Sequence, residues 1–180
     1  ALSNDYDIEW ALLVSPTNYG TARYPTNTTQ VAITDTDLTL AVHLCGRYAS
    51  DVMTSKVPIF STIDPARWNR VQVNHRNPNP SLIQRFAESV GRPCIMQMRS
   101  DTFPPESSTQ MMFDRSGGRG ELPSSWPAYP GFNVGYAGGL TPDNVASALA
   151  TINATGPYWI DVETGVRTRD KFDLAQCRAS

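Results

Sequence analysis

The paired glycines Gly138 and Gly139 are the residues best suited to hold a ligand in this 180-residue chain. They follow an apolar run, Val134 to Ala137, that is typical of a buried strand, and they precede Thr141 and Pro142, which favour a helix start. Glycine lets backbone N–H groups approach a ligand, and a helix N-terminus attracts anions. The stretch therefore predicts a strand, a glycine turn and a helix that together hold a phosphate.

A second loop of the same kind follows. Tyr158 to Val162 is another buried-strand candidate, and it leads through Glu163 into Thr164 and Gly165. A glycine at a strand end is more often plain turn chemistry, but two such loops in succession would face one anion. In a (β/α)8 barrel, the loops after the seventh and eighth strands are where a phosphate commonly sits.

Three further side chains, in loops or at the ends of expected strands, are candidates for catalysis or binding. Asp114 ends the strand expected over Thr109 to Asp114, where it serves catalysis or braces the glycine loop that follows. Cys45 lies beside a glycine and an arginine, so it is either a reactive thiolate or a small buried hydrophobe. Arg23 lies in a polar loop, where it binds a substrate anion or is solvated.

The order and spacing of several motifs resemble the phosphoribosylanthranilate isomerase family, the barrel of tryptophan biosynthesis. The resemblance is specific over about the last third of the chain and looser near Arg23. The blocks that carry it are Met112-Phe113-Asp114, Gly117-Gly118-Arg119-Gly120, Ala137 to Val145 and Asp161 to Arg167.

The resemblance implies an enzyme that performs an Amadori rearrangement of N-(5-phosphoribosyl)anthranilate, without a metal or cofactor. It assigns Asp114 as the general acid and Arg23 as the partner of the anthranilate carboxylate. Backbone groups of Gly138, Gly139, Thr164 and Gly165 are implied to hold the phosphate. The family's base is a cysteine at the end of a first strand, and no residue before Ile8 matches it.

Cys45 is therefore the only candidate for the base that we can name, as a relocated thiol. Glu163 replaces a small residue of the family and would repel a phosphate unless Arg167 or Arg169 offsets its charge. Two interpretations follow. The protein is either the isomerase or a divergent barrel of the same family that binds a phosphorylated metabolite, or has another role, without this activity.

The composition narrows the class of protein. The net charge is −2 with no basic run, which excludes a nucleic-acid partner, and no apolar run is long enough to cross a membrane. The three cysteines form no CxxC pair, which argues against a disulfide framework or a zinc site and favours the cytoplasm. The expected partner is a small phosphorylated substrate, and the sequence does not determine an oligomeric state.

The expected fold is an α/β TIM (β/α)8 barrel that lacks or does not show its first βα unit, as a single domain over residues 1–180. Ile8 to Val14 would be the barrel's second strand, because only seven residues precede it. We expect an incomplete sequence to explain the gap. The other expected elements are strands at 38–44, 70–74 and 93–99 and helices at 26–37, 80–90, 143–152 and 170–178. In the last helix, Phe172, Leu174 and Cys177 are expected to contact the core.

Overall fold

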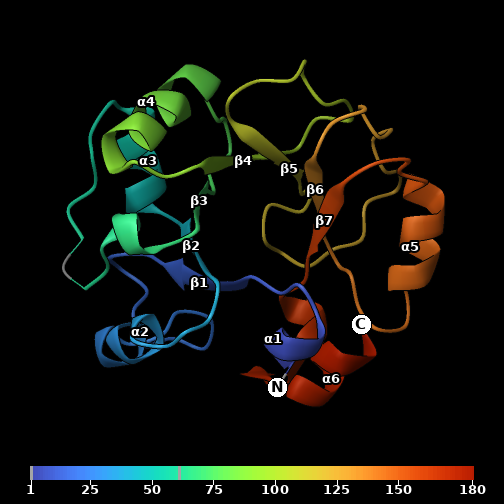
Figure 1. The fold of residues 1–180 in the computed structure, drawn as a ribbon, viewed down its shortest axis with the longest axis horizontal. Helices are drawn as coiled ribbons and strands as arrows, with labels where there is room; N and C mark the ends of the chain where they lie inside the picture. Colours follow the sequence, from blue (N-terminus) through green and yellow to red (C-terminus); the bar gives the residue numbers. More distant parts are fainter. Residues whose placement is uncertain (1, 61) are drawn as a thin grey trace. The chain divides into compact units, whose positions relative to one another are not determined.

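The computed structural model describes residues 2–60 and 62–180, and the chain divides into two compact units, Ala1–Met96 and Gln97–Ser180. Helices lie between the parallel strands of the first unit and between β6 and β7 of the second, so the predicted α/β class is confirmed (Figure 1). Strand β4 crosses the boundary between the units, and the order of strands in the sheet is their order along the chain, β1 to β7. A parallel sheet in sequence order requires a crossover after each strand.

The first unit holds four parallel strands and most of the helices. The strands are β1 (Trp10–Val14), β2 (Leu40–Leu44), β3 (Arg70–Val73) and β4 (Cys94–Met98). The helices are α1 (Leu2–Asp5), α2 (Asn27–Thr34), α3 (Arg47–Met53), α4 (Pro80–Val90) and the short η1 (Pro65–Arg67). Every residue of β2 and β4 is buried, as expected for strands with both faces covered.

Helix α4 shows how closely a strong pattern predicts an element. The helix expected over 80–90 is present with those bounds, its N-cap Asn79 accepts the Leu82 N–H at 3.2 Å, and Gly91 ends it in the left-handed conformation. Ile83 and Phe86 are buried on its inner face. Helix α3 was not predicted, although Tyr48, Ala49 and Val52 give it a buried stripe that lies against the core.

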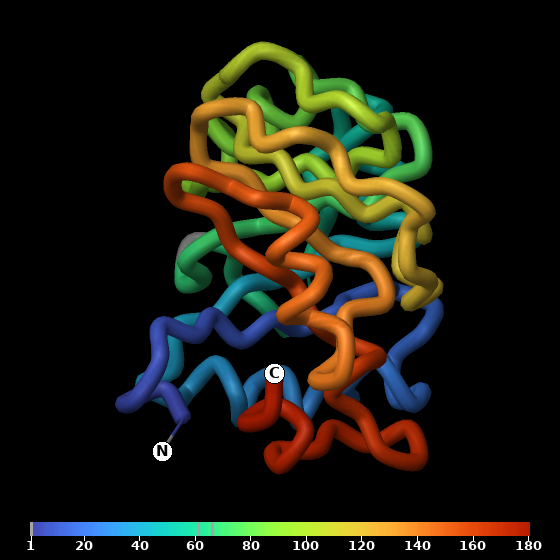
Figure 2. Tube along the Cα trace, turned by 90° about the vertical axis from the view of Figure 1, so that its right-hand side faces the viewer, coloured from blue at the N-terminus to red at the C-terminus, as the bar shows by residue number. Residues whose placement is uncertain are grey.

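The second unit holds three parallel strands, β5 (Gln110–Phe113), β6 (Val134–Ala137) and β7 (Tyr158–Asp161). Helix α5 (Val145–Ile152) packs its buried Ile152 into a cluster with Phe113, Val134 and Tyr136. The Trp126 ring packs edge-on against the rings of Phe113 and Tyr136, with ring centroids 5.8 Å and 6.1 Å apart. Figure 2 shows β6 and β7 side by side in this unit.

The end of the chain differs from the prediction. The expected helix over 170–178 is α6 (Leu174–Ala179), preceded by η2 (Thr164–Val166) and the hairpin strands β8 (Arg167–Thr168) and β9 (Lys171–Phe172). Asp173 caps α6 by accepting two backbone N–H bonds, so the helix begins after it. The expected core contacts of Phe172 and Leu174 are wrong, because these side chains are 49% and 57% exposed.

Candidate active site

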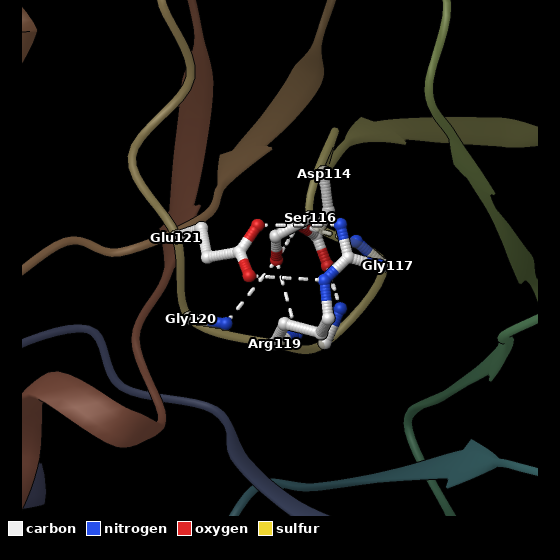
Figure 3. Close-up of polar contacts among 7 residues, drawn as sticks. Asp114, Ser116, Gly117, Arg119, Gly120 and Glu121 are labelled. Atoms are coloured by element: carbon white, nitrogen blue, oxygen red, sulfur yellow. Dashed lines mark hydrogen bonds and ion pairs between the residues drawn. The ribbon is translucent and has the colours of Figure 1, made fainter.

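Asp114 follows directly on β5 and is almost fully buried, with 4% of its surface exposed. Its carboxylate accepts four hydrogen bonds. Figure 3 shows Asp114 with Ser116 and Gly117 of the loop that supplies two of them. Oδ1 accepts from Ser116 Oγ at 2.7 Å and from the Gly117 N–H at 3.1 Å. Oδ2 accepts from Gln97 Nε2 at 2.8 Å and from the Gly118 N–H at 2.7 Å. An ionised carboxyl group offers about four lone-pair positions, so all of them are used.

Ser116 organises the loop that wraps around this carboxylate. Its hydroxyl donates to Asp114 and accepts the N–H groups of Arg119 at 3.1 Å and Gly120 at 3.2 Å. Gly117, Gly118 and Gly120 all have positive φ, between 62° and 87°, which only glycine adopts readily. The glycine-rich sequence thus serves to close the loop on Asp114. The bracing role that the sequence left open for Asp114 is present in the structure.

The cations around this loop have defined partners or packing. The exposed Arg119 pairs with Glu121, with Nε to Oε1 at 3.1 Å and Nη2 to Oε2 at 3.2 Å, and this pairing raises the pKa of the guanidinium above its usual value. Arg115 forms an ion pair with Asp101. The Arg99 guanidinium lies against Gly117, where an added methyl group would meet it at 1.9 Å.

Gly138 and Gly139 follow β6 and are closely covered by the same loop. A methyl group on Gly138 would lie 3.2 Å from the Glu121 carbonyl oxygen and 3.4 Å from Asp114 Oδ1. A methyl group on Gly139 would lie 2.5 Å from the Leu122 nitrogen. Both positions therefore need glycine, because the segment from Glu121 to Leu122 packs directly against them. The same close packing places the Asp114 carboxylate beside Gly138.

The helix expected to open at Thr141 begins later, at Val145. The side chain of Asn144 explains the difference, because it bridges the turn in between. Its Oδ1 accepts the Thr141 N–H at 2.9 Å, and its Nδ2 donates to the Gly139 carbonyl at 2.9 Å. The prediction of Thr141 as the helix cap, with Pro142 at the first position, is therefore wrong. A turn over residues 142–144 separates the paired glycines from the first residue of the helix.

Thr164 and Gly165 lie in η2, against the turn that follows Gly139. A methyl group on Gly165 would meet the Leu140 carbonyl oxygen at 1.9 Å, so the two loops pack in direct contact. Within the described part of the chain, the N–H groups of Gly139, Thr164 and Gly165 make no hydrogen bond. Backbone N–H groups in adjoining turns are suited to an anion.

Glu163, at the edge of these loops, is neutralised as the sequence required. Arg167 Nη1 lies 3.4 Å from Glu163 Oε1, and the Thr164 hydroxyl donates to Oε2 at 3.1 Å. Both charged side chains are largely buried, with 14% and 25% of their surfaces exposed. The positive charge of Arg167 therefore balances the negative charge of Glu163 beside the loops.

Cys45 and Arg23 belong to the first unit. Cys45 follows β2, is 9% exposed, and its Sγ accepts the Asn74 Nδ2–H at 3.4 Å. Beyond Asn74, the buried Gln72 extends the polar chain, with its Nε2 donating to Asn74 Oδ1 at 2.8 Å and lying 3.5 Å from His43 Nδ1. Burial and, to a smaller degree, the nearby Cys45 raise the pKa of Tyr24. Arg23 lies half-buried in the loop after β1.

A family model described as N-(5'-phosphoribosyl)anthranilate isomerase matches residues 75–179, which is more than half of the chain. The chain belongs to this family. The matched segment includes Asp114 and both glycine loops, whereas Arg23 and Cys45 lie outside it.

Solved phosphoribosylanthranilate isomerases share the fold. The enzyme of Pyrococcus furiosus is 16% identical with a TM-score of 0.60, over 95% of this chain and 84% of that one. The enzyme of Thermotoga maritima is 15% identical with a TM-score of 0.63, over the same shares of both chains. A third structure, 15% identical with a TM-score of 0.60 and again 95% and 84% coverage, holds reduced 1-(o-carboxyphenylamino)-1-deoxyribulose 5-phosphate. No curated protein sequence matches the chain.

Ser116 and Gln97 were not singled out from the sequence. The signal for Ser116 is its place two residues after an aspartate at a strand end, where a hydroxyl can reach back to the carboxylate. Gln97 is a polar residue in an otherwise apolar strand, and buried polar groups need partners. Among the described residues there is no group of His, Cys, Asp or Glu that could hold a metal ion, and no helix long and apolar enough to span a membrane.

Proposed function

We propose that this member of the family is an isomerase that converts N-(5'-phosphoribosyl)anthranilate to the corresponding 1-deoxyribulose 5-phosphate in tryptophan biosynthesis. The observation that carries the proposal is one arrangement in the second unit. The buried carboxylate of Asp114 lies beside Gly138, and the turn after Gly139 packs against Gly165. An acid next to adjoining loops with available N–H groups suits a phosphorylated sugar.

In the proposed reaction, Asp114 protonates the ribose ring oxygen, and the bond between that oxygen and C1 breaks. The lone pair of the substrate's nitrogen forms a C1–nitrogen double bond as the ring opens. A base then removes the proton from C2, the C2–H electron pair forms a C1–C2 double bond, and the pair of the C1–nitrogen double bond returns to nitrogen. The resulting enolamine takes up a proton at C1 and gives the ketose product. The reaction transfers protons within one substrate, with no net oxidation, so neither a metal nor a redox cofactor enters the balance. Cys45 is the proposed base, and Asn74 donates a hydrogen bond to its sulfur.

Binding is divided among three groups in this proposal. The N–H groups of Gly139, Thr164 and Gly165, with the turn at Gly138, hold the phosphate and so position the reacting carbons. Arg23 holds the anthranilate carboxylate as a charged, planar donor. The proposed fold is a (β/α)8 barrel in one domain in which β1 corresponds to the family's second strand, and the proposed location is the cytoplasm.

The second candidate is a family member that binds a phosphorylated metabolite without isomerase activity. The saturation of Asp114 favours it, because a carboxylate with four donors has no free position for a substrate proton. Both candidates require the phosphate site. Only the first requires an acid that takes up a proton again after each turnover. Turnover therefore separates them.

The test is the decay of phosphoribosylanthranilate fluorescence with wild-type protein and with Asp114→Asn. We expect turnover by the wild type and a loss of at least about 100-fold in the variant, the size of a typical general-acid contribution. If folded wild-type protein shows no turnover but binds the reduced deoxyribulose phosphate compound in calorimetry, the second candidate is correct.

A separate variant tests whether the two glycine loops bind the phosphate. Gly165→Ala places a methyl group on the Leu140 carbonyl and must separate the loops, so we expect a raised KM and weaker binding of the same compound. Gly131→Ala is the control for general destabilisation, because its φ of 92° strains an added methyl group that nevertheless meets no atom within 4 Å. Equal KM values for the two variants would argue against a phosphate at these loops.

A further inference from the structure

The hydroxyl of Ser116 can act only as a donor toward Asp114. A serine hydroxyl has one proton and two lone pairs. The N–H groups of Arg119 and Gly120 already point at its oxygen, at 3.1 Å and 3.2 Å. Its one proton is left for Asp114 Oδ1, at 2.7 Å. With 2% of its surface exposed, the residue has little water to exchange partners with.

The two oxygens of Asp114 therefore differ in their ability to carry a proton. A proton on Oδ1 would face the Ser116 hydroxyl and the Gly117 N–H, and neither donor can become an acceptor while the loop stays closed. A proton on Oδ2 would face the Gly118 N–H and the side chain of Gln97. A glutamine amide can turn to present its oxygen instead of its nitrogen.

Apart from Asp114, the Ser116 hydroxyl bonds backbone N–H groups and not the charged side chains packed around the loop. In the second unit they are Arg99 against Gly117, the pair Arg119 and Glu121, and Arg115, which is bound to Asp101. The opposite charges of Arg119 and Glu121 lie within one ion pair. A change in the proton affinity of Asp114 after removal of the hydroxyl therefore reports the loss of its hydrogen bonds, both the one to Oδ1 and the two that hold the loop.

We propose that Ser116 is a positioning residue of the isomerase that excludes the proton from Oδ1 of Asp114, so that Oδ2, beside the adaptable amide of Gln97, is the oxygen that takes up and delivers it. The inference rests on the proposed function for its catalytic consequence. The assignment of the protonated oxygen concerns Asp114 alone. It can be measured in a protein that shows no isomerase activity.

Removing the Ser116 hydroxyl removes a donor that favours the charged carboxylate, so Asp114 should keep its proton to higher pH. A hydrogen bond to a charged group corresponds to a shift of about one pH unit. In Ser116→Ala, the high-pH fall of kcat/KM, where the acid loses its proton, should move upward by about one unit. Ser116→Thr keeps the hydroxyl and should restore the wild-type profile.

The matched control is Ser100→Ala, whose hydroxyl donates to the Thr102 carbonyl in an exposed loop. Ser116→Cys keeps only a weak donor toward Oδ1 and should move the same limb upward by a smaller amount, which gives a second test if Ser116→Ala does not fold. A pH profile that superimposes on the wild-type profile, in whichever of these two variants folds, would overturn the proposal.

The carbon NMR signal of the Asp114 carboxyl group gives a readout without turnover. Its titration midpoint should rise by about one unit in Ser116→Ala and return in Ser116→Thr. A rise in a protein that shows no turnover would support the role of Ser116 and refute the isomerase. An unchanged midpoint beside normal turnover would refute the role of Ser116 and leave the isomerase intact.

Discussion

Replacing Asp114 by asparagine should destabilise the protein as well as remove its acid. The amide keeps one oxygen and places an NH2 group at the other position, where two donors already point. At the Oδ1 position the NH2 would face Ser116 and Gly117, and Ser116 cannot turn. At the Oδ2 position it would face Gln97, which can turn, and Gly118, which cannot. The second orientation is therefore preferred.

The magnitude follows from the donor that loses its acceptor. In that orientation the bond from the Gly118 N–H to Oδ2, 2.7 Å long, is replaced by a contact between two donors. A buried donor that loses its acceptor costs about 1–3 kcal/mol, and because this bond is part-buried the loss should lie in the lower half of that range. For a chain of this size each kcal/mol corresponds to about 2–4 °C, so a loss of about 1–2 kcal/mol lowers Tm by about 2–8 °C.

Thermal and urea denaturation of wild type, Asp114→Asn and Asp143→Asn measure this effect. Asp143 is an exposed carboxylate of the same unit, in the turn before α5, and its amide variant should unfold within about 1 °C of wild type. Equal Tm values for wild type and Asp114→Asn would refute the idea that the carboxylate holds the loop. Activity should then be compared at a temperature where both proteins are folded.

Two further predictions concern the core of the second unit. In Gly135→Ala, the new methyl group would meet Trp159 Cε2 at 2.4 Å and Met112 Cγ at 2.7 Å; we expect a net loss of about 1–2 kcal/mol in urea denaturation, because overpacking outweighs the gain from a stiffer unfolded chain. The double variant with Trp159→Phe should recover part of that loss, and strict additivity would contradict the packing argument. Burial raises the pKa of Tyr136 to about 12 from 10.0. Because its folded pKa is the higher one, its contribution to stability is complete below about pH 10 and is lost as pH rises to about 12, and Tyr136→Phe should flatten this part of the stability curve.

The sequence predicted the parts of the fold that depend on local pattern. Apolar runs identified β2, β4 and β6 to within two residues, and the stripe with Ile83 and Phe86 identified α4 with its bounds. The missed α3 has no capping side chain, since its N-cap is Gly46, and its buried face is short. The late start of α5 depends on one side-chain bridge from Asn144, which composition does not reveal.

The sequence predicted where Asp114 and the two glycine loops lie, but not the hydrogen bonds that Asp114 accepts. The motifs located Asp114 at a strand end and the two glycine loops in adjoining turns, and the expected partner for Glu163 is present as Arg167. The four donors on Asp114 depend on positive φ angles at Gly117 and Gly118 and on the depth of Gln97, all of which are set by tertiary packing. A residue's place along the chain does not determine which donors fold back onto it.

The contact between Gly165 and the Leu140 carbonyl also limits how this protein can change over evolution. At 1.9 Å from a backbone oxygen there is no room for any side chain, and a backbone atom cannot be replaced to make room. An insertion or substitution that displaces one loop must be matched by a change in the other. The two loops are therefore expected to be inherited and exchanged between relatives as a pair, and a library that randomises one alone should yield few folded members.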